Sequence, residues 1–72
     1  MFKLKSYIKE QGVTQRNFAK LLGITPNAIS KYLANQRFPN RDIILKIEKA
    51  TNGYVRPSDW YTSDFVNSKI NR

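Results

Sequence analysis

Residues 14–34 read TQRNFAKLLGITPNAISKYLA and contain two short helical patterns separated by one tight turn. The first pattern opens at Thr14, whose hydroxyl can cap the free amides of a first helical turn, and it ends at Leu22. The second opens at Thr25, another good N-cap, and Pro26 then takes the first helical position, where its missing amide costs nothing. Two helices joined by so few residues must pack against each other.

The turn and its flanking residues have the side chains that two crossing helices need. Gly23 allows the positive φ that reverses the chain within a tight turn. Ala19 lies where the helices cross, and only a small side chain lets their backbones approach. Ile24 is expected to point back into the core, and Ile29 to fill the space between the helices. This is the layout of a DNA-reading helix-turn-helix.

The second helix of this motif, expected to end at about Ala34, divides into two faces at about 100° per residue. The apolar arc holds Ala28, Ile29, Tyr32 and Leu33, and the opposite arc holds Pro26, Asn27, Ser30, Lys31 and Ala34. The helix contains no acid, so its polar face can enter a major groove without charge repulsion. Taken singly, such residues are also what the solvent-exposed side of any surface helix presents.

Weaker patterns flank the motif. An amphipathic helix is expected over about residues 2–11, and another over roughly 41–52 after a cap by Asn40. A polar loop, 35–39, separates the motif from that cap. A single helical turn can start within 57–60.

Nothing in the sequence divides the chain, so its 72 residues are predicted to form one all-α domain. We place the core over about residues 2–61 and expect the tail, 62–72, to be either flexible or involved in dimer formation. The aromatic residues near this end are expected to complete the core or to form a partner surface. They are Tyr54, Trp60, Tyr61 and Phe65.

Composition excludes most catalytic chemistry. The chain has neither Cys nor His, which removes most metal sites, thiol nucleophiles and imidazole bases, and its five carboxylates are scattered. We therefore expect no enzyme activity, no cofactor and no metal. The net charge of +8 favours a polyanionic partner. The chain lacks an apolar run long enough to span a membrane and lacks a signal peptide, so a cytoplasmic protein is expected.

Residues 13–50 resemble the helix-turn-helix family of Cro and the phage repressors. The matching residues are Thr14-Gln15, Phe18-Ala19, Leu22-Gly23-Ile24, Thr25, Ile29 and Tyr32-Leu33. The resemblance implies a bundle of about five helices whose third helix reads DNA, and a homodimer that binds a two-fold symmetric operator.

The family's roles carry over to ten positions. The resemblance implies that bases are read by Thr25, Pro26, Asn27, Ser30 and Lys31, and that phosphates are contacted by Gln15, Arg16, Asn35, Gln36 and Arg37. Asn27 suits adenine and Lys31 suits guanine. The family often has a polar residue at the position of Pro26. Pro26 departs from this pattern, because it cannot donate a hydrogen bond and offers only its shape to DNA.

We therefore predict a sequence-specific double-stranded DNA-binding regulator, most simply a Cro-type repressor that binds a palindromic operator as a homodimer. One alternative is an antitoxin that represses its own operon and holds a toxin through residues 54–72. Another is a nonspecific nucleic-acid-binding or RNA-binding module. Leu45 breaks the pattern of its helix, and we expect it to pack against the 54–66 segment or against a second subunit.

Overall fold

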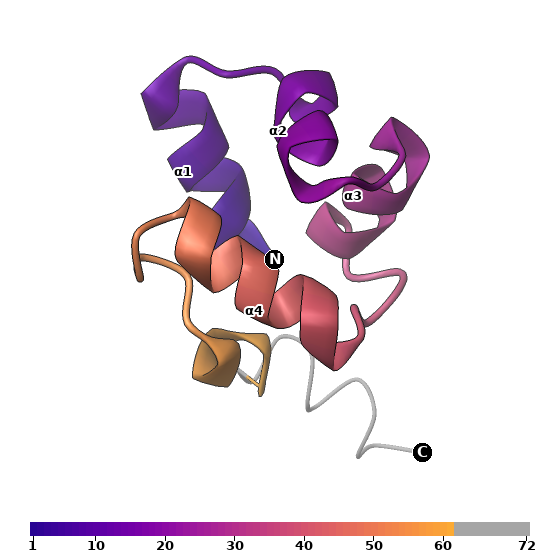
Figure 1. Ribbon diagram of the computed structural model, residues 1–72, viewed down its shortest axis with the longest axis vertical. Helices are drawn as coiled ribbons and strands as arrows, with labels where there is room; N and C mark the ends of the chain where they lie inside the picture. Colours follow the sequence, from indigo (N-terminus) through magenta and orange to yellow (C-terminus); the bar gives the residue numbers. More distant parts are fainter. Residues whose placement is uncertain (62–72) are drawn as a thin grey trace.

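The computed structural model describes residues 1–61, and every regular element among them is helical (Figure 1). The elements are α1 (Phe2–Gln11), α2 (Gln15–Leu22), α3 (Pro26–Leu33), α4 (Arg41–Ala50) and the 3-10 helix η1 (Pro57–Tyr61). The predicted all-α helix-turn-helix bundle is confirmed. The expectations for the tail, including Phe65 and the role of 62–72 in dimer formation, lie outside the described residues.

Side-chain caps explain where α2, α3 and α4 begin. In each case an oxygen at the N-cap accepts a hydrogen bond from the backbone N–H three residues later, which satisfies one free amide of the first turn. The caps are Thr14 to Asn17 (3.0 Å), Thr25 to Ala28 (3.1 Å) and Asn40 to Ile43 (2.9 Å). All three caps follow from residue types that the sequence shows directly.

The turn between α2 and α3 has the geometry that its glycine predicts. Gly23 adopts a left-handed conformation with a φ of 76°, and the N–H of Ile24 donates to the carbonyl of Ala19 at 3.0 Å. Ala19 and Ile29 are fully buried where α2 packs on α3, and Ile24 is half-buried against the same core. The scaffold roles of these four residues are therefore confirmed.

In Figure 1, α4 crosses the middle of the molecule, with α2 above it and η1 below it. α4 contributes three buried isoleucines to the core, and α1 contributes Leu4 and Ile8. α4 ends at Ala50, before the expected Asn52, because Thr51 caps it and Asn52 turns to a φ of 58°.

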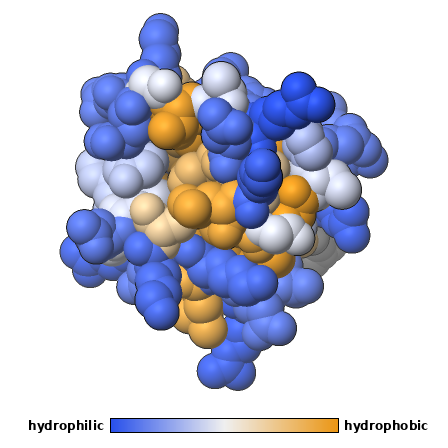
Figure 2. Space-filling view, turned by 45° about the horizontal axis from the view of Figure 1, so that its top comes forward, coloured by the Kyte–Doolittle hydropathy of each residue, from blue (hydrophilic) through white to orange (hydrophobic). Residues whose placement is uncertain are grey.

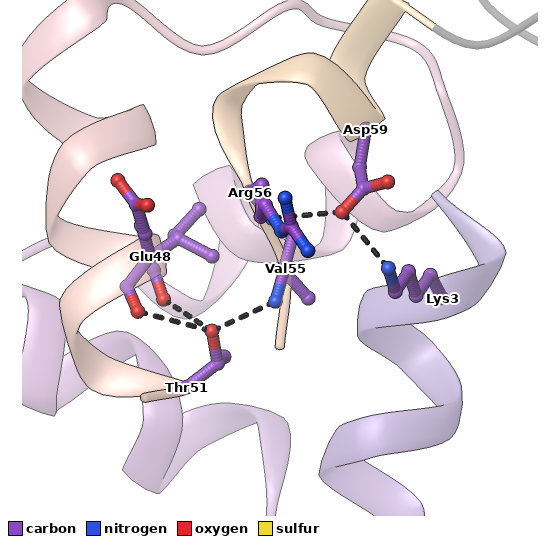
Figure 3. Close-up of polar contacts among 7 residues, drawn as sticks. Lys3, Glu48, Thr51, Val55, Arg56 and Asp59 are labelled. Carbon is purple, nitrogen blue, oxygen red and sulfur yellow. Dashed lines mark hydrogen bonds and ion pairs between the residues drawn. The ribbon is translucent and has the colours of Figure 1, made fainter. Parts of the chain in front are cut away.

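Thr51 fastens the segment after α4 to the end of that helix (Figure 3). Its hydroxyl donates to the carbonyl of Ile47 at 2.8 Å and accepts from the N–H of Val55 at 3.0 Å. Thr51 and Val55 are both buried. The hydroxyl therefore satisfies a buried amide that has left the helix, and it directs the chain back towards η1.

Trp60 of η1 is fully buried and closes the underside of the core. Its ring meets Tyr32 of α3 and Phe38 edge-on, with centroids 6.4 and 6.3 Å away. Its indole Nε1 has no hydrogen-bond partner within residues 1–61. The prediction that Trp60 completes the core is confirmed. Tyr54 and Tyr61 instead remain largely exposed.

Asp59 holds η1 to α1 at the surface (Figure 3). Its carboxylate accepts from the backbone N–H of Arg56 at 2.8 Å and from the ammonium of Lys3 at 3.0 Å. Partial burial raises the pKa of Asp59, but the Arg56 amide and the Lys3 charge lower it more, so the net pKa is below its ordinary value.

Candidate nucleic-acid interface

The outward face of α3 is a continuous exposed surface. All five residues predicted to read bases are exposed: Thr25, Pro26, Asn27, Ser30 and Lys31. The opposite face is buried through Ile29, Tyr32 and Leu33. The two-sided division of this helix is therefore confirmed.

Gln15 and Arg16 lie at the start of α2, and both are exposed. Arg16 lines a shallow hollow together with Thr25 and Pro26 at the start of α3. The fold thus brings the first turns of both helices to one surface. Helix N-termini present free amides and the positive end of the helix dipole, which favour anions such as phosphates.

Lys20 also lines this hollow, and the sequence reasoning had not assigned it to the interface. The signal was available, because Lys20 follows Arg16 by four residues and therefore shares its side of α2. The hollow combines one guanidinium and one ammonium beside the start of α3.

The loop after α3 carries the other predicted phosphate contacts, and Asn35, Gln36 and Arg37 are all exposed. Asn35 has a left-handed backbone with a φ of 59°, and its side-chain oxygen accepts from the nitrogen of Met1 at 2.6 Å. The same nitrogen donates to the carbonyl of Leu33 at 2.6 Å. Asn35 therefore ties the end of α3 to the start of α1, a structural role that the sequence did not reveal.

The cations of this surface have no acidic neighbour to neutralise them. Among residues 1–61, Arg16, Lys31 and Arg37 make no ion pair, and the salt bridge of this part of the chain joins Lys3 to Asp59 beside η1. No acidic residue lies on α2 or α3. The positive charge of this face is therefore available to a ligand.

Residues 1–61 contain neither a membrane-spanning helix nor a cluster of metal ligands. None of their helices has the length and apolar character needed to cross a membrane. Nor does this region gather three or more acidic, Cys or His side chains that could hold a metal ion.

The comparisons with known proteins agree with this geometry. A family model described as "Helix-turn-helix" matches residues 4–57, which is 54 of the 72 residues and includes α2, α3, α4 and all but the first two residues of α1. No curated protein and no solved structure gives a significant match. The exposed face of α3, the tight turn at Gly23 and this match lead to one conclusion: the chain belongs to the Cro/repressor-like helix-turn-helix family of DNA-binding transcriptional regulators.

Proposed function

We propose that this regulator is a sequence-specific repressor of the Cro type that binds a palindromic operator as a homodimer. The observation that supports it best is the face of α3, which is exposed, free of acids and edged by cations that make no ion pair within residues 1–61. A helix of this kind fits a major groove, where base edges present distinct patterns of donors and acceptors.

The proposed base contacts follow from side-chain chemistry. The amide of Asn27 can bond adenine N6 and N7, and the ammonium of Lys31 can bond guanine O6 and N7. The Ser30 hydroxyl can donate or accept. The Thr25 oxygen already accepts from the Ala28 amide, so its hydroxyl proton and one lone pair remain for DNA.

Phosphate contacts would flank this helix on two sides. Gln15 and Arg16 would meet one stretch of backbone from the start of α2, and Gln36 and Arg37 another from the loop after α3. Asn35 would contribute only its amide N–H groups, because its oxygen bonds Met1. Such contacts position the protein and make its affinity depend on salt.

A homodimer requires a self-complementary apolar surface. α4 and η1 provide a candidate hollow, lined mainly by Phe38, Pro39, Ile44, Leu45, Pro57 and Tyr61. Leu45 shares the hollow with η1 and remains 46% exposed, and Tyr61 is 61% exposed. Leu45 thus lies beside Pro57 and Tyr61, and the exposed part of its side chain could contact a second subunit. Two subunits joined here would need to place their α3 helices about 34 Å apart, one turn of DNA.

Selection of binding sites from a pool of random DNA duplexes tests specificity. A palindromic consensus would support both sequence reading and the dimer, whereas enrichment of no sequence would favour the nonspecific module. Asn27→Ala and Lys31→Ala should each cost about 1–3 kcal/mol on the selected site and much less on random DNA. Equal losses on all sequences would contradict the assignment of α3.

Matched variants separate phosphate contacts from the dimer. Arg37→Ala should lower the slope of affinity against salt by about one while leaving sequence preference intact. Leu45→Lys should convert the dimer into a folded monomer, as measured by sedimentation and circular dichroism. A fully folded dimer in this variant would exclude Leu45 from the subunit contact.

A further inference from the structure

A third hollow lies between the end of α2 and the second half of α4. Its floor is apolar, with Leu21, Leu22 and Ala50, and its rim carries Lys20, Lys46 and Lys49. Leu21 is 68% exposed. Figure 2 shows apolar side chains gathered across the centre of one face, with hydrophilic side chains around them.

The apolar floor of this α2–α4 hollow is separate from the proposed DNA interface, although Lys20 lines both hollows. Residues 16 and 21 are separated by about 140° around a helix, so Arg16 and Leu21 lie on opposite flanks of α2. Arg16 faces the start of α3, and Leu21 faces α4. A DNA backbone is an anion without an aliphatic surface, so it would satisfy the lysines and leave Leu21 in water.

The hollow is also distinct from the candidate dimer surface. Lys46, Lys49 and Ala50 lie on a different side of α4 from Ile44 and Leu45, and the two hollows share no residue. In a symmetric contact through the α2–α4 hollow, lysines of one copy would oppose lysines of the other in a chain of net charge +8. Like charges placed opposite each other disfavour such a contact.

Helix dipoles account for only two of the three lysines on the rim of the hollow. Lys20 and Lys49 lie in the last turns of their helices, where cations offset the exposed carbonyls. Lys46 lies outside the last turn of α4, and Leu21 gains nothing from the dipole. No acid lines the hollow, and its three lysines make no ion pair within residues 1–61.

We propose that the α2–α4 hollow binds an acidic amphipathic helix of a partner protein. The partner's apolar side chains would cover Leu21 and the exposed part of Ala50, and its carboxylates would pair with Lys20, Lys46 and Lys49. Laying an amphipathic helix into an apolar groove is a common mode of peptide recognition. The surface would let the regulator hold a protein while α3 remains on DNA.

The test uses the full chain and a synthetic probe. The probe is a fluorescein-labelled helical peptide with leucines on one face and glutamates on the other. One control peptide has the same composition in scrambled order, and a second has glutamine in place of glutamate. Fluorescence anisotropy measures affinity, and amide chemical shifts in a ¹⁵N NMR spectrum locate the bound peptide.

Matched variants identify the side chains responsible. Leu21→Gln should weaken binding of the acidic peptide by about tenfold or more, while Phe2→Gln, which changes an exposed apolar residue of α1, should leave it within about twofold. Replacing Lys46 and Lys49 together by Glu should weaken binding about tenfold at low salt, and the same change at Lys5 and Lys9 of α1 should have a much smaller effect.

Amide shifts at Leu21, Lys46 and Ala50 that appear with the acidic peptide and with neither control would support the proposal. It would be overturned if the scrambled peptide bound equally well or if the shifts fell on α3. It would also be overturned if these amides responded to duplex DNA or to protein concentration, which would assign the hollow to DNA or to a second copy. The operator-binding tests above do not depend on this surface.

Discussion

The helix-turn-helix, residues 14–33, and the segment after α4, residues 51–61, are built in different ways. In the first, the caps and the turn use hydrogen bonds between residues three to five apart in sequence. In the second, the hydrogen bonds from Val55 to Thr51 and from Arg56 to Asp59 are also local. Trp60, however, is held by Tyr32 and Phe38, and Asp59 is also held by Lys3 from the far end of the chain.

This difference shows which structural features depend on residues close in sequence and which depend on residues that are distant in sequence. The helix-turn-helix needs a threonine before each helix and a glycine between them, and these can be read residue by residue. In the 51–61 segment, Trp60 fills a site that exists only where α3, α4 and the 35–40 loop come together. We therefore expect damage to 51–61 to lower the stability of the whole domain, and damage to the turn to have a smaller effect.

The largest effect should come from Trp60→Ala. Removing a fully buried tryptophan side chain should lower the free energy of unfolding by about 3–5 kcal/mol. The loss is measured by urea denaturation monitored by circular dichroism. Tryptophan fluorescence cannot be used, because Trp60 is the only tryptophan in the chain. Trp60→Phe is the control and should cost much less, because it keeps an aromatic ring and removes the unpaired indole N–H. Equal losses in both variants would contradict the packing role.

Thr51→Val tests the polar anchor of the same segment. The valine fills a similar volume but leaves the buried N–H of Val55 without an acceptor, so the free energy of unfolding should fall by about 1–3 kcal/mol. Thr51→Ser retains the hydroxyl and should retain most of the stability. Native stability in the valine variant would show that the hydroxyl does not hold this segment.

Gly23→Ala tests the turn of the helix-turn-helix. A Cβ at this position would meet no atom within 4 Å, so the cost should come from the φ of 76° alone. We expect about 1–2 kcal/mol, because the left-handed conformation is unfavourable for residues with a Cβ. Gly23→Asn should cost less, since asparagine tolerates this conformation. If the free energy of unfolding fell as much as in Trp60→Ala, the expected difference between the two regions would be contradicted.

The smallest effect should come from Asp59→Asn. The ion pair with Lys3 is at the surface, so its loss should cost about 0.2–1 kcal/mol, and Lys3→Met in a double-mutant cycle isolates the pairing. Because folding lowers the pKa of Asp59, its contribution is present above the unfolded pKa of about 3.9 and is lost as pH falls through the folded value. The variant should therefore lose less stability than the native chain on acidification. An unchanged acid limb in the denaturation profile would argue against the pair.

Much of the candidate site could be predicted from the sequence. The five residues expected on the outward face of α3 are all exposed, because a helix repeats at a fixed angle and its apolar arc must be buried. Gln15, Arg16 and the 35–37 loop are exposed as well. The structural role of Asn35 could not be foreseen, since its partner, Met1, is distant in sequence and meets it only when α1 packs against α3.

The sequence by itself determined the local features of this protein: the starts of α2, α3 and α4, the turn at Gly23 and the acid-free face of α3. These depend on interactions within a few residues, which residue type largely fixes. Tertiary structure alone decided that Trp60 closes the core while Tyr54 and Tyr61 stay exposed, and that Leu21 joins lysines of α4 around one hollow. The physical reason is that burial and charge clustering depend on which distant helix arrives beside a residue, and helix periodicity does not specify that neighbour.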